Sequence, residues 1–217
     1  MLSNLLKWGS RRADSAARPG DAPAPREEPI VPSKAFPRFV SLVSQMPSPV
    51  VLDFGPVLGS NVEFCGERLG CKLFIEDVVA DVDAHLRGKG PADLAASFDG
   101  RFKHPDGSID GVLCWDLFDF LEKPAAQALA RQIVRLLRPG GSVLAFFSTA
   151  PVERAAFTKF EIVDEGSLRH RYHPGVGGRK NSLPNRDIIR MFEGLTVGES
   201  FLLKNNIREM LLRKKPA

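Results

Sequence analysis

The sequence predicts a three-layer α/β domain built on a mostly parallel sheet, with an antiparallel strand pair at its C-terminal end. Short apolar runs alternate with amphipathic segments between residues 49 and 148, a rhythm typical of parallel strands joined by helices. The runs are apolar at successive positions, as strands buried on both faces are. Near the C-terminus, two further apolar runs are separated only by Lys204-Asn205-Asn206, and so short a connection permits only antiparallel pairing.

The alternation predicts the elements in chain order. The first is a helix over 36–45, because four apolar side chains fall on one helical face: Phe36, Phe39, Val40 and Val43. The stretch 78–98 is expected to hold a helix at 81–86, a Gly-rich break and a short third strand. The other expected elements are strands over 50–54, 72–75, 109–115 and 142–148, and helices over 61–69 and 124–137.

The pattern changes after Pro151. Residues 157–172 predict a polar hairpin, and 174–182 predict a Gly-rich loop. Asn185 is then placed to cap a helix. Strands over 197–203 and 207–213 form the closing antiparallel pair.

The first 35 residues are expected to be a disordered tail, which leaves 36–217 as the folded domain. Five prolines between residues 13 and 35 block regular structure, and few large apolar side chains are available to bury. The apolar segment at the very N-terminus is too short for a signal-peptide core. No stretch approaches the roughly 18 to 20 apolar residues of a membrane-spanning helix.

Charge and cysteine content narrow the functional class. A formal net charge of +4 is too small to indicate nucleic-acid binding. The three cysteines lack C-x-x-C spacing and predict buried thiols in a reducing compartment, so we expect a cytoplasmic location. The Gly-Lys-Ser or Gly-Lys-Thr of a P-loop is absent, as is the Gly-x-Gly-x-x-Gly of a dinucleotide site.

A glycine loop follows the first predicted strand of the sheet. Residues 51–59 read Val-Leu-Asp-Phe-Gly-Pro-Val-Leu-Gly, with Asp53 ahead of Gly55 and Gly59. Glycine permits a sharp turn and a close approach of the backbone to a ligand. The segment resembles the first motif of the class I, Rossmann-like S-adenosylmethionine-dependent methyltransferases, except that Val57 replaces the middle glycine of Gly-x-Gly-x-Gly. The Asp53 carboxylate either orients the loop or, as the resemblance implies, accepts from the amino-acid end of the cofactor.

Further features match this family in register, and the resemblance runs from residue 36 to 213. Glu76 ends the second strand about twenty residues after the loop, where a carboxylate can accept both hydroxyls of an adenosine ribose, and Asp77 is its rival. Residues 105–114 and 136–144 are similar to the segments that lead into the family's fourth and fifth strands. The resemblance implies S-adenosylmethionine as the cofactor, and it also assigns two more residues to cofactor binding: Asp99 and Trp115.

Candidate chemistry lies beyond the fourth strand. Asp116 either positions the methyl acceptor or accepts its proton; the alternative is that Asp116 and Asp119 cap the next helix. Between residues 166 and 190, six basic residues stand against the single acid Asp187, which suits either an anionic acceptor or solvated loop charge. His170 and His173 have no carboxylate or thiolate ligands nearby, so we predict no metal site. The six basic residues between 166 and 190 are Arg169, Arg171, Arg179, Lys180, Arg186 and Arg190.

The sequence thus predicts an S-adenosylmethionine-dependent methyltransferase for a small-molecule acceptor, anionic if the basic stretch contacts it. Nucleic acid is not expected as a partner. The alternative is a catalytically silent methyltransferase-like module that serves in binding or assembly, and the valine in the glycine loop keeps this alternative open.

Overall fold

The computed structural model describes residues 28–172 and 178–216. Its central sheet has the strand order β10-β11-β5-β4-β2-β3. The four strands from β5 to β3 are parallel, whereas β11 runs antiparallel to β5 and β10 antiparallel to β11. The predicted fold class is therefore confirmed. The strands are β2 (Val50–Asp53), β3 (Lys72–Ile75), β4 (Ile109–Trp115), β5 (Leu137–Ser148), β10 (Leu195–Leu202) and β11 (Ile207–Lys214).

The buried strands supply side chains to two hydrophobic cores. Val51 and Leu52 are consecutive in β2, yet Val51 joins one core and Leu52 joins the other. Leu113 of β4 and Leu144 of β5 lie on the same side as Val51. Because successive side chains of a strand point to opposite faces, a strand with a core on each side must be apolar at every position. This explains the unbroken apolar runs in the sequence.

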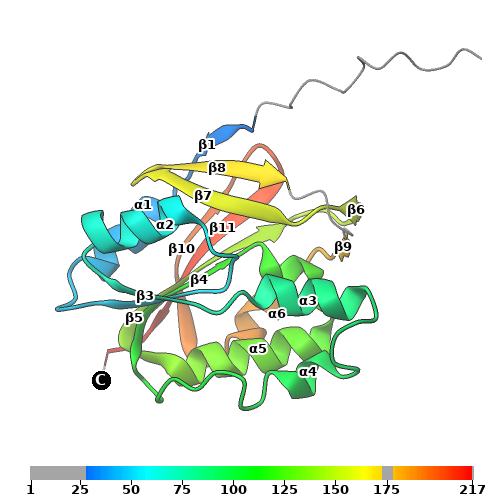
Figure 1. The fold of residues 1–217 in the computed structure, drawn as a ribbon. Coiled ribbons are helices and arrows are strands. Elements are labelled where there is room, and N and C mark those ends of the chain that lie inside the picture. The colour runs from blue at the N-terminus through cyan, green and yellow to red at the C-terminus, as the bar shows by residue number, and fades with distance from the viewer. Residues whose placement is uncertain (1–27, 173–177, 217) are drawn as a thin grey trace, which may run out of the picture.

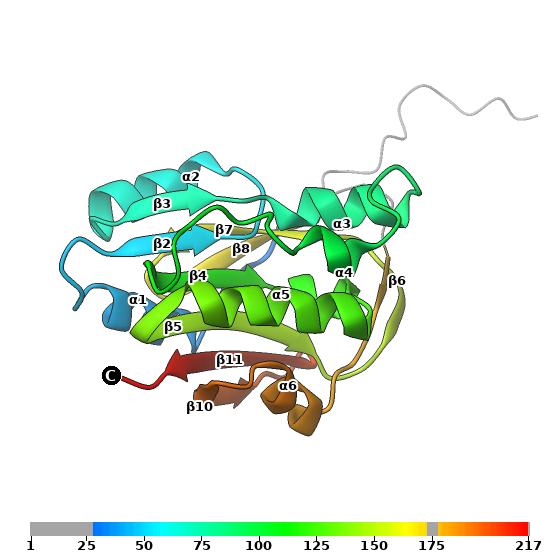
Figure 2. The ribbon, with the colours of Figure 1, turned by 90° about the horizontal axis from the view of Figure 1, so that it is seen from below.

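Helices cover both faces of the sheet (Figure 1). One face carries α1 (Phe36–Val43), α2 (Gly59–Glu63) and the π-helical turn η1 (Phe64–Arg68), and the other carries α3 (Val78–Leu86), α4 (Leu94–Ser97), α5 (Lys123–Leu136) and α6 (Asn185–Met191). In Figure 2, α5 lies along β4 and β5 while α6 lies beside β10. The helices expected at 36–45, 61–69, 81–86 and 124–137 are thus present with shifted ends. Asn185 begins α6 and Pro184 stands at its N-cap, so Asn185 is not the cap residue.

The predicted third strand is wrong. Within the fully described stretch between α3 and β4, the regular element is the short helix α4, and no strand forms. Asp93 caps α4 by accepting from the Ala96 backbone N–H at 3.0 Å, and the alanines that follow favour helix over strand. The central sheet accordingly ends at β3.

A second sheet lies on the α1 side of the molecule. The predicted hairpin is confirmed as β7 (Thr158–Asp164) and β8 (Ser167–Tyr172), and β1 (Ile30–Pro32) pairs antiparallel with β8. The expectation of a disordered tail as far as residue 35 is therefore wrong for 30–35, whereas residues 1–27 lie outside the described residues. The backbone N–H groups of Lys34 and Ala35 donate to the buried carboxylate of Glu209 at 2.7 and 2.8 Å, which fixes the entry to α1.

A small third sheet joins β6 (Val152–Ala155) to β9 (Gly178–Lys180). The loop expected over 174–182 therefore contains a strand at 178–180, and its residues 174–177 lie outside the described residues. In the described part of the chain, no helix is long and apolar enough to cross a membrane. As predicted, all three cysteines are buried free thiols: Cys65, Cys71 and Cys114.

Candidate cofactor and acceptor site

The carboxyl ends of β2, β3 and β4 bring the candidate residues to one edge of the sheet. Asp53 is the last residue of β2, Glu76 follows β3, and Trp115 ends β4. Because β2 pairs in parallel with both neighbours, these ends lie side by side, and the Glu76 backbone N–H donates to the Asp53 carbonyl oxygen at 2.9 Å. This is the edge at which open α/β sheets bind ligands.

Asp53 orients the glycine loop. One of its carboxylate oxygens, Oδ1, accepts from the Gly55 backbone N–H at 2.8 Å and from the Trp115 indole at 2.7 Å. Burial raises the pKa of Asp53 to about 6, although the hydrogen bonds from Gly55, Trp115 and Asn61 oppose that rise. Of the two roles expected from the sequence, the structure shows the loop-orienting one.

Trp115 packs in the core beside this loop. Its ring stacks on Phe160 of β7 with centroids 5.2 Å apart and planes 5° apart, and its backbone has the unusual φ of +52°. A Cβ atom added to Gly55 would lie 3.0 Å from the Trp115 indole nitrogen. The space beside the Gly55 Cα is therefore occupied by the Trp115 indole.

The rest of the glycine loop faces solvent. Val57 is 68% exposed, so it fills no buried space. A Cβ added to Gly59 would meet no atom within 4 Å. The outer side of the loop therefore remains open, and the departure from the family motif at Val57 does not close it.

Glu76 and Asp77 have different roles in the structure. Asp77 adopts a left-handed backbone at φ +35° and caps α3, accepting from the Ala80 backbone N–H at 3.2 Å. Glu76 instead directs one carboxylate oxygen to Arg101 and the other to His104, at 2.6 and 2.8 Å. The carboxylate of Asp77 is thus engaged by its own helix, whereas the carboxylate of Glu76 is engaged by two side chains from the segment that precedes β4.

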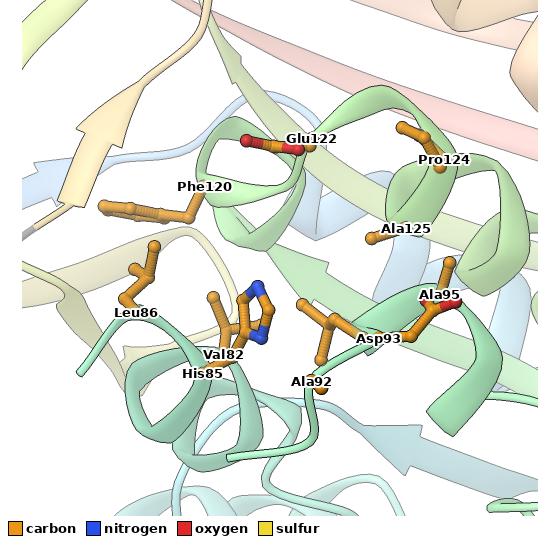
Figure 3. A pocket seen from close by; sticks show the side chains of 11 residues that line it. Val82, His85, Leu86, Ala92, Asp93, Ala95, Phe120, Glu122, Pro124 and Ala125 are labelled. Atoms are coloured by element: carbon orange, nitrogen blue, oxygen red, sulfur yellow. The ribbon is translucent and has the colours of Figure 1, made fainter. Parts of the chain in front are cut away.

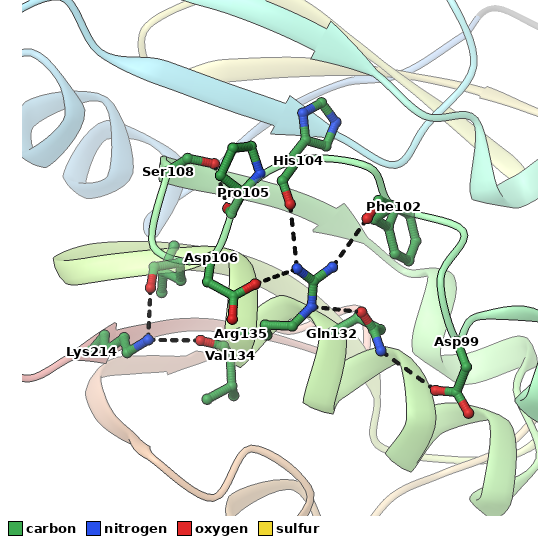
Figure 4. Close-up of polar contacts among 11 residues, drawn as sticks. Asp99, Phe102, His104, Pro105, Asp106, Ser108, Gln132, Val134, Arg135 and Lys214 are labelled. Atoms are coloured by element: carbon green, nitrogen blue, oxygen red, sulfur yellow. Dashed lines mark hydrogen bonds and ion pairs between the residues drawn. The ribbon is translucent and has the colours of Figure 1, made fainter.

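Asp99 lies apart from these acids. It follows α4, and its carboxylate accepts from the Gln132 side chain of α5 at 3.4 Å (Figure 4). The structure places Asp53, Gly55 and Trp115 in direct contact and joins Glu76 to Asp53 through the backbone. It does not bring Asp99 into that group by any hydrogen bond between described residues.

Asp116 and Lys180 form a buried ion pair just past β4. Lys180 at the end of β9 donates its ammonium to Asp116 Oδ2 at 2.6 Å, and the side chains are only 13% and 9% exposed. The turn η2 (Leu117–Phe120) follows, but Asp116 makes no side-chain capping bond to it. The capping alternative is therefore wrong for Asp116, whose carboxylate pairs with Lys180, and for Asp119, whose carboxylate accepts from Ser148.

Two more titratable groups surround this pair. Asp119 accepts from the backbone N–H and the hydroxyl of Ser148, and burial raises the pKa of Asp119 to about 7. Burial lowers the pKa of His170, whose ring packs edge-on against Phe160 at 4.9 Å. Clusters of perturbed groups of this kind are concentrated at functional sites.

Much of the remaining basic stretch is paired with acids. Arg169 and Arg171 contact Glu161 at 3.2 and 3.0 Å, and Arg171 also contacts Glu28 at 2.7 Å. Arg179 lies 3.5 Å from Glu153. His173 lies outside the described residues, and among the described ones no group of three potential metal ligands forms.

A pocket of about 430 Å³ opens between α3, α4 and the start of α5 (Figure 3). Val82, Leu86 and Phe120 give it an apolar lining, while Asp93 and Glu122 contribute carboxylates. Since α3 follows β3 and Phe120 follows β4, the pocket lies beyond the carboxyl ends of these strands. Lys180 Nζ lies 5.2 Å from the centre of the Phe120 ring, so Phe120 connects the ion pair to the pocket.

Sequence reasoning missed Arg101 and Phe160, considered Asp119 only as a helix cap, and did not single out Lys180 from its basic neighbours. Lys180 reaches Asp116 across 64 residues, and no spacing rule predicts such a contact. Arg101 occupies a segment without any motif. One signal was available for Asp119, because an acid embedded in the apolar run Leu117-Phe118-Asp119-Phe120 requires a buried partner.

The chain is similar to methyltransferases in sequence and in fold. Residues 52–145 match the family model described as a methyltransferase domain. A sarcosine/dimethylglycine N-methyltransferase of Halorhodospira halochloris is 29% identical over 137 residues, covering 58% of this chain. The matched region spans about half of that curated relative's own length (47%).

Among solved structures, the PH0226 protein of Pyrococcus horikoshii OT3 superposes with a TM-score of 0.50 at 15% identity, covering 83% of this chain and 89% of that one. The CcbJ methyltransferase of Streptomyces caelestis gives a TM-score of 0.48 at 14% identity, covering 85% and 91%. The first of these likenesses supports the fold alone. The part of the chain from β2 to β5, which carries Asp53, Glu76 and Trp115 at its strand ends, is therefore similar to the S-adenosylmethionine-dependent methyltransferases.

Proposed function

We propose that this chain transfers a methyl group from S-adenosylmethionine to a small-molecule acceptor at the carboxyl edge of β2, β3 and β4. The observation that carries the proposal is the register of the acids: Asp53 and Glu76 stand at the ends of adjacent parallel strands, on either side of an open glycine loop. The methyltransferase family model covers this same region.

The described residues fit the cofactor. The Glu76 side chain is 23% exposed and lies at the strand end where a carboxylate can accept ribose hydroxyls. The backbone beyond Gly55 is open on its outer side, since a Cβ added to Gly59 would meet no atom within 4 Å. Asp53 is committed to the loop and to Trp115, so we assign it the orientation of the loop. The cofactor, when bound, supplies a methyl group activated by a sulfonium centre.

Asp116 and Lys180 are assigned to the acceptor. An ion pair this deeply buried adds little to stability compared with apolar packing, so a functional reason for it is favoured. An acceptor that carries an amine and a carboxylate complements the pair, with its amine near Asp116 and its carboxylate near Lys180. The relative named for sarcosine and dimethylglycine supports a small amine. The pocket beside Phe120 offers such a molecule a partly apolar space with carboxylates.

A cytoplasmic location belongs to the same proposal. All three cysteines are free thiols, which supports a reducing compartment.

A specific observation favours the silent module as a second candidate. In the structure, Asp53 is bound by Gly55 and Trp115, and both carboxylate oxygens of Glu76 are in contact with protein side chains. A module that no longer binds cofactor could retain such contacts as ordinary structural bonds.

Titration calorimetry with S-adenosylhomocysteine, the demethylated product, distinguishes the two candidates. We expect measurable heat and a raised melting temperature, since a ligand at a hundred times its Kd adds about 2.7 kcal/mol of stability. Absence of both effects with product and with S-adenosylmethionine would leave only the silent module. If product binds, small amines are then incubated with S-adenosylmethionine, sarcosine first, and mass spectrometry follows the gain of one methyl group.

A further inference from the structure

We propose that Arg101 is an internal competitor of the cofactor for Glu76 and thereby sets the affinity of the site. The inference rests on the proposed function, because it takes Glu76 as the acid that accepts the ribose hydroxyls. It concerns a residue outside the recognisable motifs of the chain, on the segment between α4 and β4.

The contacts of Arg101 converge on Glu76. Its Nη1 lies 2.6 Å from Glu76 Oε2, and its Nη2 donates to the Glu76 carbonyl oxygen. The other carboxylate oxygen, Oε1, lies 2.8 Å from Nε2 of His104, whose ring packs against Phe74 at 4.7 Å. The protein itself therefore supplies a partner to each oxygen that the ribose would use.

The segment that carries Arg101 is held in place from α5 (Figure 4). The guanidinium of Arg135 donates to the carbonyl oxygens of Phe102 and His104 at 3.1 and 3.3 Å and to the Asp106 carboxylate at 2.5 Å. These bonds fix the backbone on both sides of Lys103. Arg101 and His104 are consequently presented to Glu76 by a fixed backbone, so their contacts with Glu76 are a built feature of the fold.

The Arg101 side chain can leave Glu76 at small cost. Both side chains are 23% exposed, so water reaches the ion pair and weakens it. Arg101 also has a second acid, because its Nε lies 2.5 Å from Asp81 Oδ2. It therefore keeps a partner after it releases Glu76, and the ribose hydroxyls can then donate to the freed carboxylate. Cofactor binds the molecules in which Arg101 has released Glu76. The apparent affinity for cofactor therefore falls as the fraction of molecules with Arg101 on Glu76 rises.

The test measures the Kd of S-adenosylhomocysteine for the wild-type chain and for Arg101→Gln. We expect Arg101→Gln to tighten binding by about two- to fivefold, because the cofactor no longer has to displace a weak ion pair from Glu76. Arg101→Lys keeps the charge but cannot contact both acids with a fork of donors, so we expect a smaller gain. Arg87→Gln is the matched control: it removes the same charge from an arginine paired with Asp83, away from Glu76, and should leave Kd unchanged.

A double variant identifies the route of the effect. In a Glu76→Gln background, Arg101→Gln should no longer tighten binding, because the two residues act on one another. The proposed competition would be wrong if Arg101→Gln weakened the binding of product. It would also be wrong if Arg101→Gln tightened binding equally in the wild-type and Glu76→Gln backgrounds. Neither result would contradict the cofactor site itself. Failure of the wild-type chain and of every variant to bind product would instead remove the proposed function. Melting curves of each variant verify the fold, and Arg101→Lys retains the test if Arg101→Gln is unstable.

Discussion

The two glycines of the loop should respond to alanine in opposite ways. An added methyl group at Gly55 would lie 3.0 Å from the Trp115 indole nitrogen and 3.1 Å from the Asp53 carboxylate, both buried. The stacked Phe160 prevents the indole from moving aside, so we expect the overpacking cost of about 1–3 kcal/mol. At Gly59 the methyl group meets no atom within 4 Å, and the residue begins α2. Alanine there should stabilise by about 0.4–1 kcal/mol through the unfolded chain.

Urea denaturation followed by circular dichroism measures both free energies of unfolding. Because a change of 1 kcal/mol moves the melting temperature of a domain this size by roughly 2–4 °C, thermal melts provide a second reading. Near-ultraviolet circular dichroism reports whether the environment of Trp115 changes in Gly55→Ala. If Gly55→Ala were as stable as the wild type, or if both alanines were equally harmful, the assignment of Gly55 to the packing of Trp115 would be wrong.

The remaining predictions concern the acids and the valine of the site. Glu76→Ala should weaken the binding of S-adenosylhomocysteine by about 1.5–3 kcal/mol in calorimetry, the worth of hydrogen bonds to a charged group, with the fold unchanged. Asp77→Ala should leave that affinity unchanged but lower the free energy of unfolding by about 0.5–2 kcal/mol, because it removes the cap of α3; the reverse result would exchange their roles. Burial raises the pKa of Asp119 to about 7, so the folded state holds the Asp119 proton more tightly than the unfolded chain does. The protonated carboxyl therefore contributes stability that is fully present below about pH 4 and is lost as pH rises through about 7. Asp119→Asn, measured by urea denaturation at pH 5 and pH 8, should therefore reduce the fall in stability between these values, and an unchanged fall would contradict the assignment. Val57→Gly should cost no more than about 0.5–1 kcal/mol in a thermal melt, since the exposed valine leaves no cavity, and a larger loss would show that the loop is packed.

Local patterns in the sequence determined most of the central sheet. Strand β4 was predicted with its observed bounds, and α1 was identified from the single face of Phe36, Phe39 and Val43. Such elements are predictable because the spacing of apolar residues reports directly which side of a strand or helix is buried. The glycine loop, Glu76 and the segments before β4 and β5 likewise indicated the family, since parallel strands bring motifs at their ends to one edge.

Two local expectations failed because tertiary contacts decided the outcome. Residues 30–35 looked like part of a proline-rich tail, yet Ile30–Pro32 pairs with β8, more than a hundred residues later in the chain. A strand was expected between α3 and residue 98, but Asp93 caps the short helix α4 there instead. A single sequence gives no measure of such partners in advance.

The α/β fold, the resemblance to methyltransferases and the sheet edge proposed for the site could all be predicted from the chain alone, because they follow from periodicity and from motifs that are contiguous in the chain. The contacts of each site residue could be learned only from the folded arrangement. It committed Asp53 to Gly55 and Trp115, gave Glu76 the partners Arg101 and His104, and paired Asp116 with Lys180. The physical reason is that hydrogen bonds and ion pairs depend on distances of about 3 Å between atoms, and these distances are fixed by packing between segments far apart in sequence.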